Sequence, residues 1–320
     1  MIGDVLPRTE ESEPAIGASR GKVRRAVEVF RKNRFSYLLL LPTVTFFVLL
    51  LWGPFLGGVW MSLHRWNFTG QPQWVGLENY TFLLQWDVFY TSLRATIIFA
   101  FTTFFQLGIA LAAALSIRHI SRDGVQNLIS ALFLIPYTLP PIVSGSIWLY
   151  LLNPDFGPLF GYLIEFGLLE KPIYWSTSGT SSLAVIMFVA SWAFWPFMFI
   201  ILFASLENIP SSHYETARVY GANRLQAFRH VTLPQMKSAI LVVISIRLIW
   251  NLSKISQPLQ LAGGGPGNQT SILGLLLYNF ANTRQAFGQA YAVGIVLLAV
   301  SLVFTFVFIR EFQRERGVSE

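Results

Sequence analysis

The stretch "SSHYETARVYGANRLQAFRHVTLP", residues 211–234, lies between two long hydrophobic runs of the chain. Its first part carries Ser212 and, three positions later, Glu215. This spacing is a capping box, in which each side chain satisfies a free backbone N–H group of the other residue. The pattern predicts that a helix starts at His213.

The second part of the stretch predicts a turn and another helix. Gly221 suits the left-handed conformation that ends many helices, and Asn223 with Gln226 repeats the capping arrangement. Pro234 predicts the boundary between this second helix and the next hydrophobic run. A segment that only connects two runs does not need this order, so we expect two short helices at a glycine turn.

The composition predicts that the chain lies in a membrane. Apolar residues make up 53% of the 320 residues and charged residues only 12%, whereas soluble domains average about 25% charged. Six runs with few or no charged residues are long enough to cross the bilayer, for which roughly 20 helical residues suffice. They cover about residues 37–62, 95–117, 127–153, 182–206, 238–261 and 285–309, and the third is expected to kink at Pro136, Pro140 and Pro141.

Lysine and arginine are distributed unequally over the segments that join the runs. If the N-terminus is cytoplasmic, that side holds 17 of these residues and the opposite side only Arg65, Arg94, Lys171 and Arg284. Cytoplasmic segments of membrane proteins carry the excess of basic residues. We therefore expect both termini and the stretch 211–234 in the cytoplasm.

The predicted organisation is an all-α polytopic membrane protein with six transmembrane helices. Residues 1–34 form a cytoplasmic tail, in which Val23, Val27 and Phe30 have the helical spacing of an interfacial helix. Residues 35–310 form the transmembrane domain, which includes the cytoplasmic loop 207–236. Residues 311–320 form a C-terminal cytoplasmic tail.

Several functional classes are excluded or disfavoured. The chain has no cysteine, and its four histidines do not have the spacing of metal ligands, so no metal site is predicted. The net charge of +7 follows the membrane topology instead of forming one patch, so no nucleic-acid partner is expected. A membrane-embedded enzyme would need convergent acids, a metal set or an activated nucleophile, and these residues supply none.

The stretch 211–234 resembles the EAA loop of ABC importer permeases. That pattern is Glu-Ala-Ala, three residues, Gly, nine residues, Ile, one residue, then Leu-Pro. Thr216 departs from its first Ala, Val231 replaces Ile, and Tyr220 stands where Asp is common. Taken alone, Glu215 is equally consistent with simple capping and Gly221 with simple helix termination. The matching positions are Glu215, Thr216, Ala217, Gly221, Val231, Leu233 and Pro234.

Other segments extend the resemblance over most of the chain. "VGLENYTFLL" (75–84), "FLIPYTLPPIVSGSIWLYLLNPDFG" (133–157) and "LAGGGPGNQTSILGLLLYNFA" (261–281) are similar to maltose-type sugar permeases, and the last resembles the first member of the usual permease pair. The run 263–267 lacks the Lys-Ser/Thr of a nucleotide-binding loop and is expected to be an extracytoplasmic turn.

This resemblance implies a permease subunit of the type I fold in the plasma membrane of a prokaryote, without catalysis or a cofactor of its own. It implies a homologous second permease subunit and two ATPase subunits that bind ATP and Mg. It also implies an extracytoplasmic substrate-binding protein that delivers a sugar or oligosaccharide. In the family, the EAA loop is a coupling helix that sits in a cleft of the ATPase.

The fifth run carries cations that lipid does not tolerate. With a rise of about 1.5 Å per residue from Ser238, Arg247 lies roughly 14 Å deep, near the bilayer centre. A guanidinium costs at least about 2.5 kcal/mol there if it faces lipid, so we expect it to face inward. Asn251 and Lys254 follow on the same stripe and Trp250 lies beside it.

Two interpretations of these four residues remain open. They form one wall of the substrate pathway, where Arg and Asn bond sugar hydroxyls and Trp stacks on a sugar ring. Alternatively, Arg247 pairs with carbonyls or an acid of the second permease, and Lys254 reaches the far interface. The aromatic clusters 191–199 and 101–106 are expected to serve lipid contact or helix packing.

An ion-coupled secondary transporter of a small polar solute is the alternative function. Such carriers usually place Asp or Glu inside their spans, and the six runs contain none.

Overall fold

The structure is a computed structural model that describes residues 31–120 and 122–316. The predicted interfacial helix at Val23, Val27 and Phe30 lies outside the described residues. The described chain divides into two units, one ending at Gly58 and one beginning at Val59. The first unit contains α2 (Arg34–Phe47), the π-helical turn η1 (Val48–Trp52) and the start of α3 (Gly53–Ser62).

The second unit is helical apart from one short ribbon, in which β1 (His64–Arg65) pairs antiparallel with β2 (Gln73–Trp74). Its elements up to the long central helix are α4 (Glu78–Leu84), α5 (Asp87–Ala100), α6 (Thr102–Ile117), α7 (Asp123–Thr138), α8 (Pro141–Leu151), α9 (Pro158–Glu165), the 3-10 turn η2 (Trp175–Thr177) and α10 (Gly179–Glu207). The remainder are α11 (Ser211–Val219), α12 (Arg224–Ala227), the π-helical turn η3 (Phe228–Thr232), α13 (Leu233–Leu252), α14 (Ser256–Ala262), α15 (Leu273–Tyr278), the π-helical turn η4 (Asn279–Thr283) and α16 (Phe287–Arg316).

Five helices among the described residues are long and apolar enough to cross a membrane, and the bent pair α7 and α8 makes up to six. The third predicted run therefore kinks at Pro140 and Pro141 as expected, but not at Pro136, which lies inside the continuous helix α7. The two halves of the run meet at an angle of 92° next to Pro140 and Pro141. A proline cannot donate the backbone hydrogen bond that would continue the helix, and it disfavours helical geometry at the preceding residue.

Two predicted spans lie in helices with different boundaries. The second begins at Asp87 instead of Ala95, so Arg94 lies inside a helix and not in a loop. The fifth begins at Arg224 instead of Ser238, and it ends at Leu252 instead of near Leu261. Pro258 accounts for the early end, because its ring would collide with the carbonyl four residues earlier in a continuous helix.

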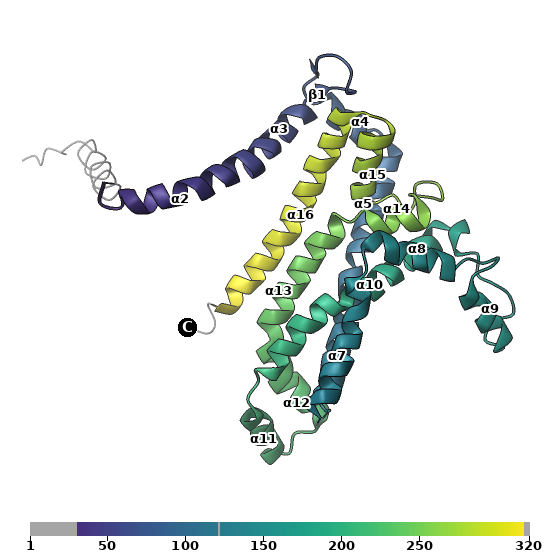
Figure 1. Cartoon of the computed structure of the whole chain (residues 1–320). Coiled ribbons are helices and arrows are strands. Elements are labelled where there is room, and N and C mark those ends of the chain that lie inside the picture. Colours follow the sequence, from purple (N-terminus) through teal and green to yellow (C-terminus); the bar gives the residue numbers. More distant parts are fainter. Residues whose placement is uncertain (1–30, 121, 317–320) are drawn as a thin grey trace, which may run out of the picture. The chain divides into compact units, whose positions relative to one another are not determined.

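α10 organises the core of the second unit. It is apolar on all sides, as a helix surrounded by others should be, and it packs most extensively along α6 and further against α7, α13 and α14. A second cluster joins α4, α5, α13, α15 and α16. In Figure 1, β1 and α4 lie at one end of this unit, and α11 and α12 lie at the other.

Candidate functional site

The two short helices in the stretch 211–234 form as predicted around Gly221. This glycine has φ of 77°, a conformation that L-residues rarely adopt. The N–H of Gly221 donates to the carbonyl of Arg218, and the N–H of Ala222 donates to that of Ala217, each at 2.9 Å. This pair of bonds is a Schellman motif, which satisfies carbonyls left free at the end of α11.

The capping box predicted for Ser212 and Glu215 is wrong. α11 begins at Ser211, two residues before His213, and its N-cap is Pro210, which has no side-chain capping bond. Ser212 therefore lies inside the first turn, where its hydroxyl is no longer at the capping position. Glu215 is exposed, and no hydrogen bond joins its side chain to any other residue that the structure describes.

The second capping box is confirmed. The side chain of Asn223 accepts from the N–H of Gln226 at 2.9 Å, and the side chain of Gln226 accepts from the N–H of Asn223 at 2.8 Å. The sequence predicted that the helix after this capping box ends at Pro234, and this prediction is wrong. The helix continues through the π-helical turn η3 into α13, and Pro234 follows shortly after η3, where the regular hydrogen-bond pattern of the helix is already interrupted.

Tyr214 attaches α11 to the transmembrane helices, a contact that the sequence analysis missed. Its hydroxyl accepts from Arg118 at the end of α6 at 2.6 Å and shares a hydrogen bond of 2.9 Å with Thr232 in η3. The Arg118 guanidinium also stands 4.3 Å from the centre of the Tyr214 ring. α11 is thus fixed to two helices at one side chain.

The seven positions of the loop pattern differ in exposure. Ala217 and Val231 are half-buried, whereas the remaining five are exposed: Glu215, Thr216, Gly221, Leu233 and Pro234. The side chains beside them, Val219 and Tyr220, are each 86% exposed. The end of α11 therefore presents two adjacent large side chains to its surroundings.

Arg247 lies in the interior of the second unit and holds three helices together. It is only 1% exposed. Its Nε donates to Gln106 Oε1 on α6 at 3.0 Å, and its Nη2 donates to Asn251 Oδ1 at 2.9 Å. Asn251 donates onward to Thr103 at 2.9 Å, and Gln106 donates to the backbone carbonyl of Ala190 on α10 at 3.1 Å.

Neither sequence interpretation anticipated Thr103 and Gln106 as partners. Both lie in the segment 101–106, which was expected to serve packing or lipid contact because phenylalanines dominate it. The signal was available, since a lone glutamine among apolar residues in a membrane helix needs a polar partner. Arg247 is also not central in its helix, because α13 ends five residues later at Leu252.

The four candidate pathway residues do not all share one helical stripe. Arg247, Trp250 and Asn251 lie on α13, whereas Lys254 lies beyond its end. Nevertheless Arg247, Trp250 and Lys254 line one pocket of about 350 Å³ together with Tyr137 and Phe194.

Aromatic rings surround the two cations of this pocket. The Lys254 ammonium stands 3.5 Å from the centre of the Phe194 ring, and the Arg247 guanidinium stands 4.7 Å from it. Trp250 is 43% exposed and packs its ring 4.8 Å from that of Phe197. None of the described residues that line the pocket is an acid. The pocket therefore combines positive charge with the exposed rings of Trp250 and Tyr137, which suits a polar, ring-shaped ligand.

Comparison with known proteins identifies the family of this chain. Residues 106–314, about two thirds of the chain, match the family of binding-protein-dependent transport system inner membrane components. The chain belongs to this family. As a binding-protein-dependent inner membrane component, it is a multi-pass plasma membrane protein and a transport subunit of an importer.

Relatives of this inner membrane component include three named transport proteins. The trehalose/maltose transport system permease protein MalF of Thermococcus litoralis is 31% identical over 89% of this chain and 97% of its own length. The diacetylchitobiose uptake system permease protein NgcF of Streptomyces coelicolor is 29% identical over 94% of this chain and 89% of its own. The sn-glycerol-3-phosphate transport system permease protein UgpA of Agrobacterium fabrum is 26% identical over 87% of this chain and 94% of its own.

A solved structure shares the fold of this inner membrane component. One chain of a bacterial ABC transporter involved in the import of the acidic polysaccharide alginate superposes with a TM-score of 0.77 at 22% identity, covering 91% of this chain and 99% of that chain. The type I permease fold predicted from the sequence is thereby confirmed.

Proposed function

We propose that the chain is the permease subunit of an ATP-driven importer that carries a sugar or oligosaccharide by alternating access. The observation that carries this proposal is full-length similarity to permeases named for trehalose, maltose and diacetylchitobiose. Two ATPase subunits bind ATP and Mg, a homologous permease completes the pathway, and an extracytoplasmic binding protein delivers the substrate. The termini lie in the cytoplasm, and residues 35–310 form the transmembrane domain.

In this proposal α11 is the element that docks on an ATPase subunit. Its exposed end carries Glu215, Thr216, Val219 and Tyr220, and the half-buried Ala217 allows close packing. The hydrogen bonds of Tyr214 support the role, because a lever must be fixed to the helices that it moves. The capped turn at Gly221 adds stiffness. ATP-driven closure of the ATPase subunits displaces α11, and the movement passes to α6 and α13.

The pocket at Arg247, Trp250 and Lys254 is the proposed stretch of substrate pathway in this subunit. Asn251 belongs to it indirectly, because its side chain holds the Arg247 guanidinium in place. Trp250 offers a ring face, while Arg247 and Lys254 offer donors for hydroxyl or anionic groups. An acidic group on the cargo would suit the pocket, since no carboxylate among its described lining residues would repel it.

A secondary transporter remains the alternative. Among the described spans, carboxylates occur only in terminal turns, at Asp87, Asp123 and Glu207. Ion-coupled carriers place such groups within the membrane, so this distribution supports the ATP-driven importer.

One experiment separates the two mechanisms. Uptake of radiolabelled maltose, trehalose and diacetylchitobiose is measured in cells whose cytoplasmic ATP is depleted while the membrane potential is held. An ATP-driven importer should stop taking up sugar as the cytoplasmic ATP is lost. Continued uptake at the original rate would establish the secondary carrier, and absence of uptake for every sugar in energised cells would refute the sugar assignment.

A further inference from the structure

A second polar pocket is lined by residues of β1 and α4. These two elements lie at the end of the unit opposite to α11 (Figure 1). The pocket has a volume of about 360 Å³, within the roughly 300–1,000 Å³ range of small-molecule sites. Its walls come from the ribbon between β1 and β2, from α4 and from the first turn of α16. No part of it overlaps the pocket at Arg247.

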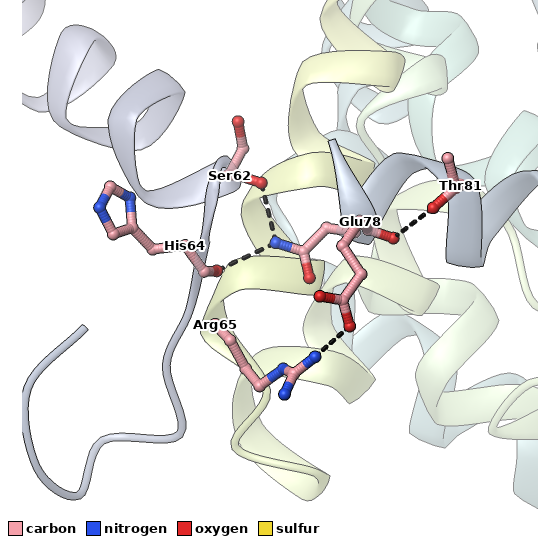
Figure 2. Close-up of polar contacts among 6 residues, drawn as sticks. Ser62, His64, Arg65, Glu78 and Thr81 are labelled. Atoms are coloured by element: carbon pink, nitrogen blue, oxygen red, sulfur yellow. Dashed lines mark hydrogen bonds and ion pairs between the residues drawn. The ribbon is translucent and has the colours of Figure 1, made fainter. Parts of the chain in front are cut away.

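The floor of this pocket is closely packed and hydrogen-bonded. Asn79 is only 5% exposed, and its amide nitrogen donates to the carbonyls of Ser62 at 2.8 Å and His64 at 3.0 Å (Figure 2). Gly288 brings α16 against the same segment so closely that a Cβ atom there would stand 1.9 Å from the carbonyl oxygen of His64. The N–H of Phe287 donates to the carbonyl of Trp66 at 3.0 Å.

The lining offers several amide groups that the fold leaves unused. The side-chain oxygen of Asn79 and the side chains of Gln71, Gln73 and Gln289 make no hydrogen bond with any residue in the described ranges. Each glutamine amide carries two donor hydrogens and a carbonyl acceptor. Groups of this kind bond hydroxyls in either direction.

The lining also carries aromatic and balanced charged groups. The Trp66 ring packs 5.3 Å from that of Phe287 and 5.5 Å from that of Phe68. Arg65 forms an ion pair with Glu78 at the pocket edge, as Figure 2 shows. Since this pair cancels its own charge, the pocket favours a neutral ligand over an anion, unlike the pocket at Arg247.

We propose that this pocket is a second saccharide site, which holds a neutral sugar ring outside the transport pathway. The amides of Gln71 and Gln289 and the Asn79 oxygen bond the hydroxyls, and Trp66 supplies a ring face. The proposal rests on the proposed function, since a sugar must be the cargo. With α11 in the cytoplasm, the pocket opens on the side from which the substrate arrives. It therefore holds a sugar on that side of the membrane before transport.

The test compares the assembled importer with a variant that carries Gln71→Ala and Gln289→Ala. Neither side chain bonds another described residue, so the fold should be unaffected; the thermal unfolding temperature checks this. Gln85→Ala is the matched control, because Gln85 is exposed near the same end and lies outside the pocket. Saturation-transfer NMR with maltose and trehalose is measured on the importer in nanodiscs without the binding protein. Uptake kinetics are measured in parallel in proteoliposomes with the binding protein.

We expect the double variant to lose half or more of the saturation-transfer signal and to raise the KM for uptake threefold or more, with kcat retained. The Gln85→Ala control should match the wild type in both. The half-maximal concentration of binding protein for ATPase stimulation should also stay unchanged.

If the wild type transports sugar but the double variant has the same saturation-transfer signal and the same KM, this proposal alone is overturned. A shift in the half-maximal concentration of binding protein would overturn it in favour of a protein contact. A wild type that transports none of the sugars would overturn the proposed function together with it.

Discussion

Gly221 tests the proposed coupling role most directly. Its φ of 77° excludes β-branched residues at low energy, whereas the space around its Cβ position is open. Gly221→Val should therefore cost about 1 kcal/mol or more in backbone strain and reduce sugar uptake while basal ATPase activity persists. Gly221→Asn should retain uptake, because asparagine tolerates this conformation.

Gly167 provides the control for backbone strain. It has φ of 70° and equally open surroundings, but it follows α9 and is remote from α11 in the chain. Gly167→Val should carry the same strain and leave coupling intact. Equal loss of uptake in both variants would show that strain alone, and not docking, explains the effect at Gly221.

Arg247 and Trp250 should respond differently to removal, although they line the same pocket. Arg247→Ala leaves Asn251 Oδ1 without a donor, and an unsatisfied buried polar group costs about 1–3 kcal/mol. We expect a lower thermal unfolding temperature for the purified complex. Trp250→Ala should leave this temperature nearly unchanged but alter relative uptake of maltose, trehalose and sn-glycerol-3-phosphate. Wild-type selectivity in the Trp250→Ala variant would remove Trp250 from the pathway.

The helix ends offer a paired test of the two capping predictions. Asn223→Ala removes a confirmed capping box and should cost about 1 kcal/mol of helix stability. Ser212→Ala should cost almost nothing, because α11 has no side-chain cap. Hydrogen exchange of the amides at residues 222–228 and 211–216 measures the two effects separately. Faster exchange at residues 211–216 in Ser212→Ala would mean that the hydroxyl caps the helix after all.

Sequence rules that depend only on neighbouring residues predicted several local features correctly. The glycine turn at Gly221, the capping box at Asn223 and the kink at Pro140 each depend on neighbours within four residues, and all three are present. The capping rule failed at Ser212, because α11 already begins at Ser211 and has no side-chain cap.

The buried network could be predicted only in part. The sequence required Arg247 to leave lipid and placed Asn251 on the same stripe, but it did not predict the hydrogen bond between the two side chains. The sequence also did not predict that Gln106, which is 141 residues away in the chain, accepts a hydrogen bond from Arg247. Partners on different helices depend on how α6, α10 and α13 pack, and periodicity does not encode that packing.

The orientation of the chain in the membrane can be tested with single cysteines, because the natural sequence has none. Thr69→Cys lies at the β1 end and Val219→Cys lies at the α11 end, and both positions are exposed. A membrane-impermeant maleimide should label Thr69→Cys in spheroplasts and Val219→Cys only after permeabilisation. The reverse labelling pattern would invert the proposed topology and place α11 beyond the reach of any cytoplasmic ATPase.

The unbroken helix from Arg224 to Leu252 has a mechanical consequence. Hydrogen-bonded turns resist stretching, so under the proposed coupling role we expect a shift imposed on the exposed cap at Asn223 to pass along this helix. We expect it to displace the donor atoms of Arg247, which bond Gln106 on α6. We therefore expect a rotation of this helix to change the packing around Arg247 at once. An added or deleted residue in η3 should decouple the two ends of the helix.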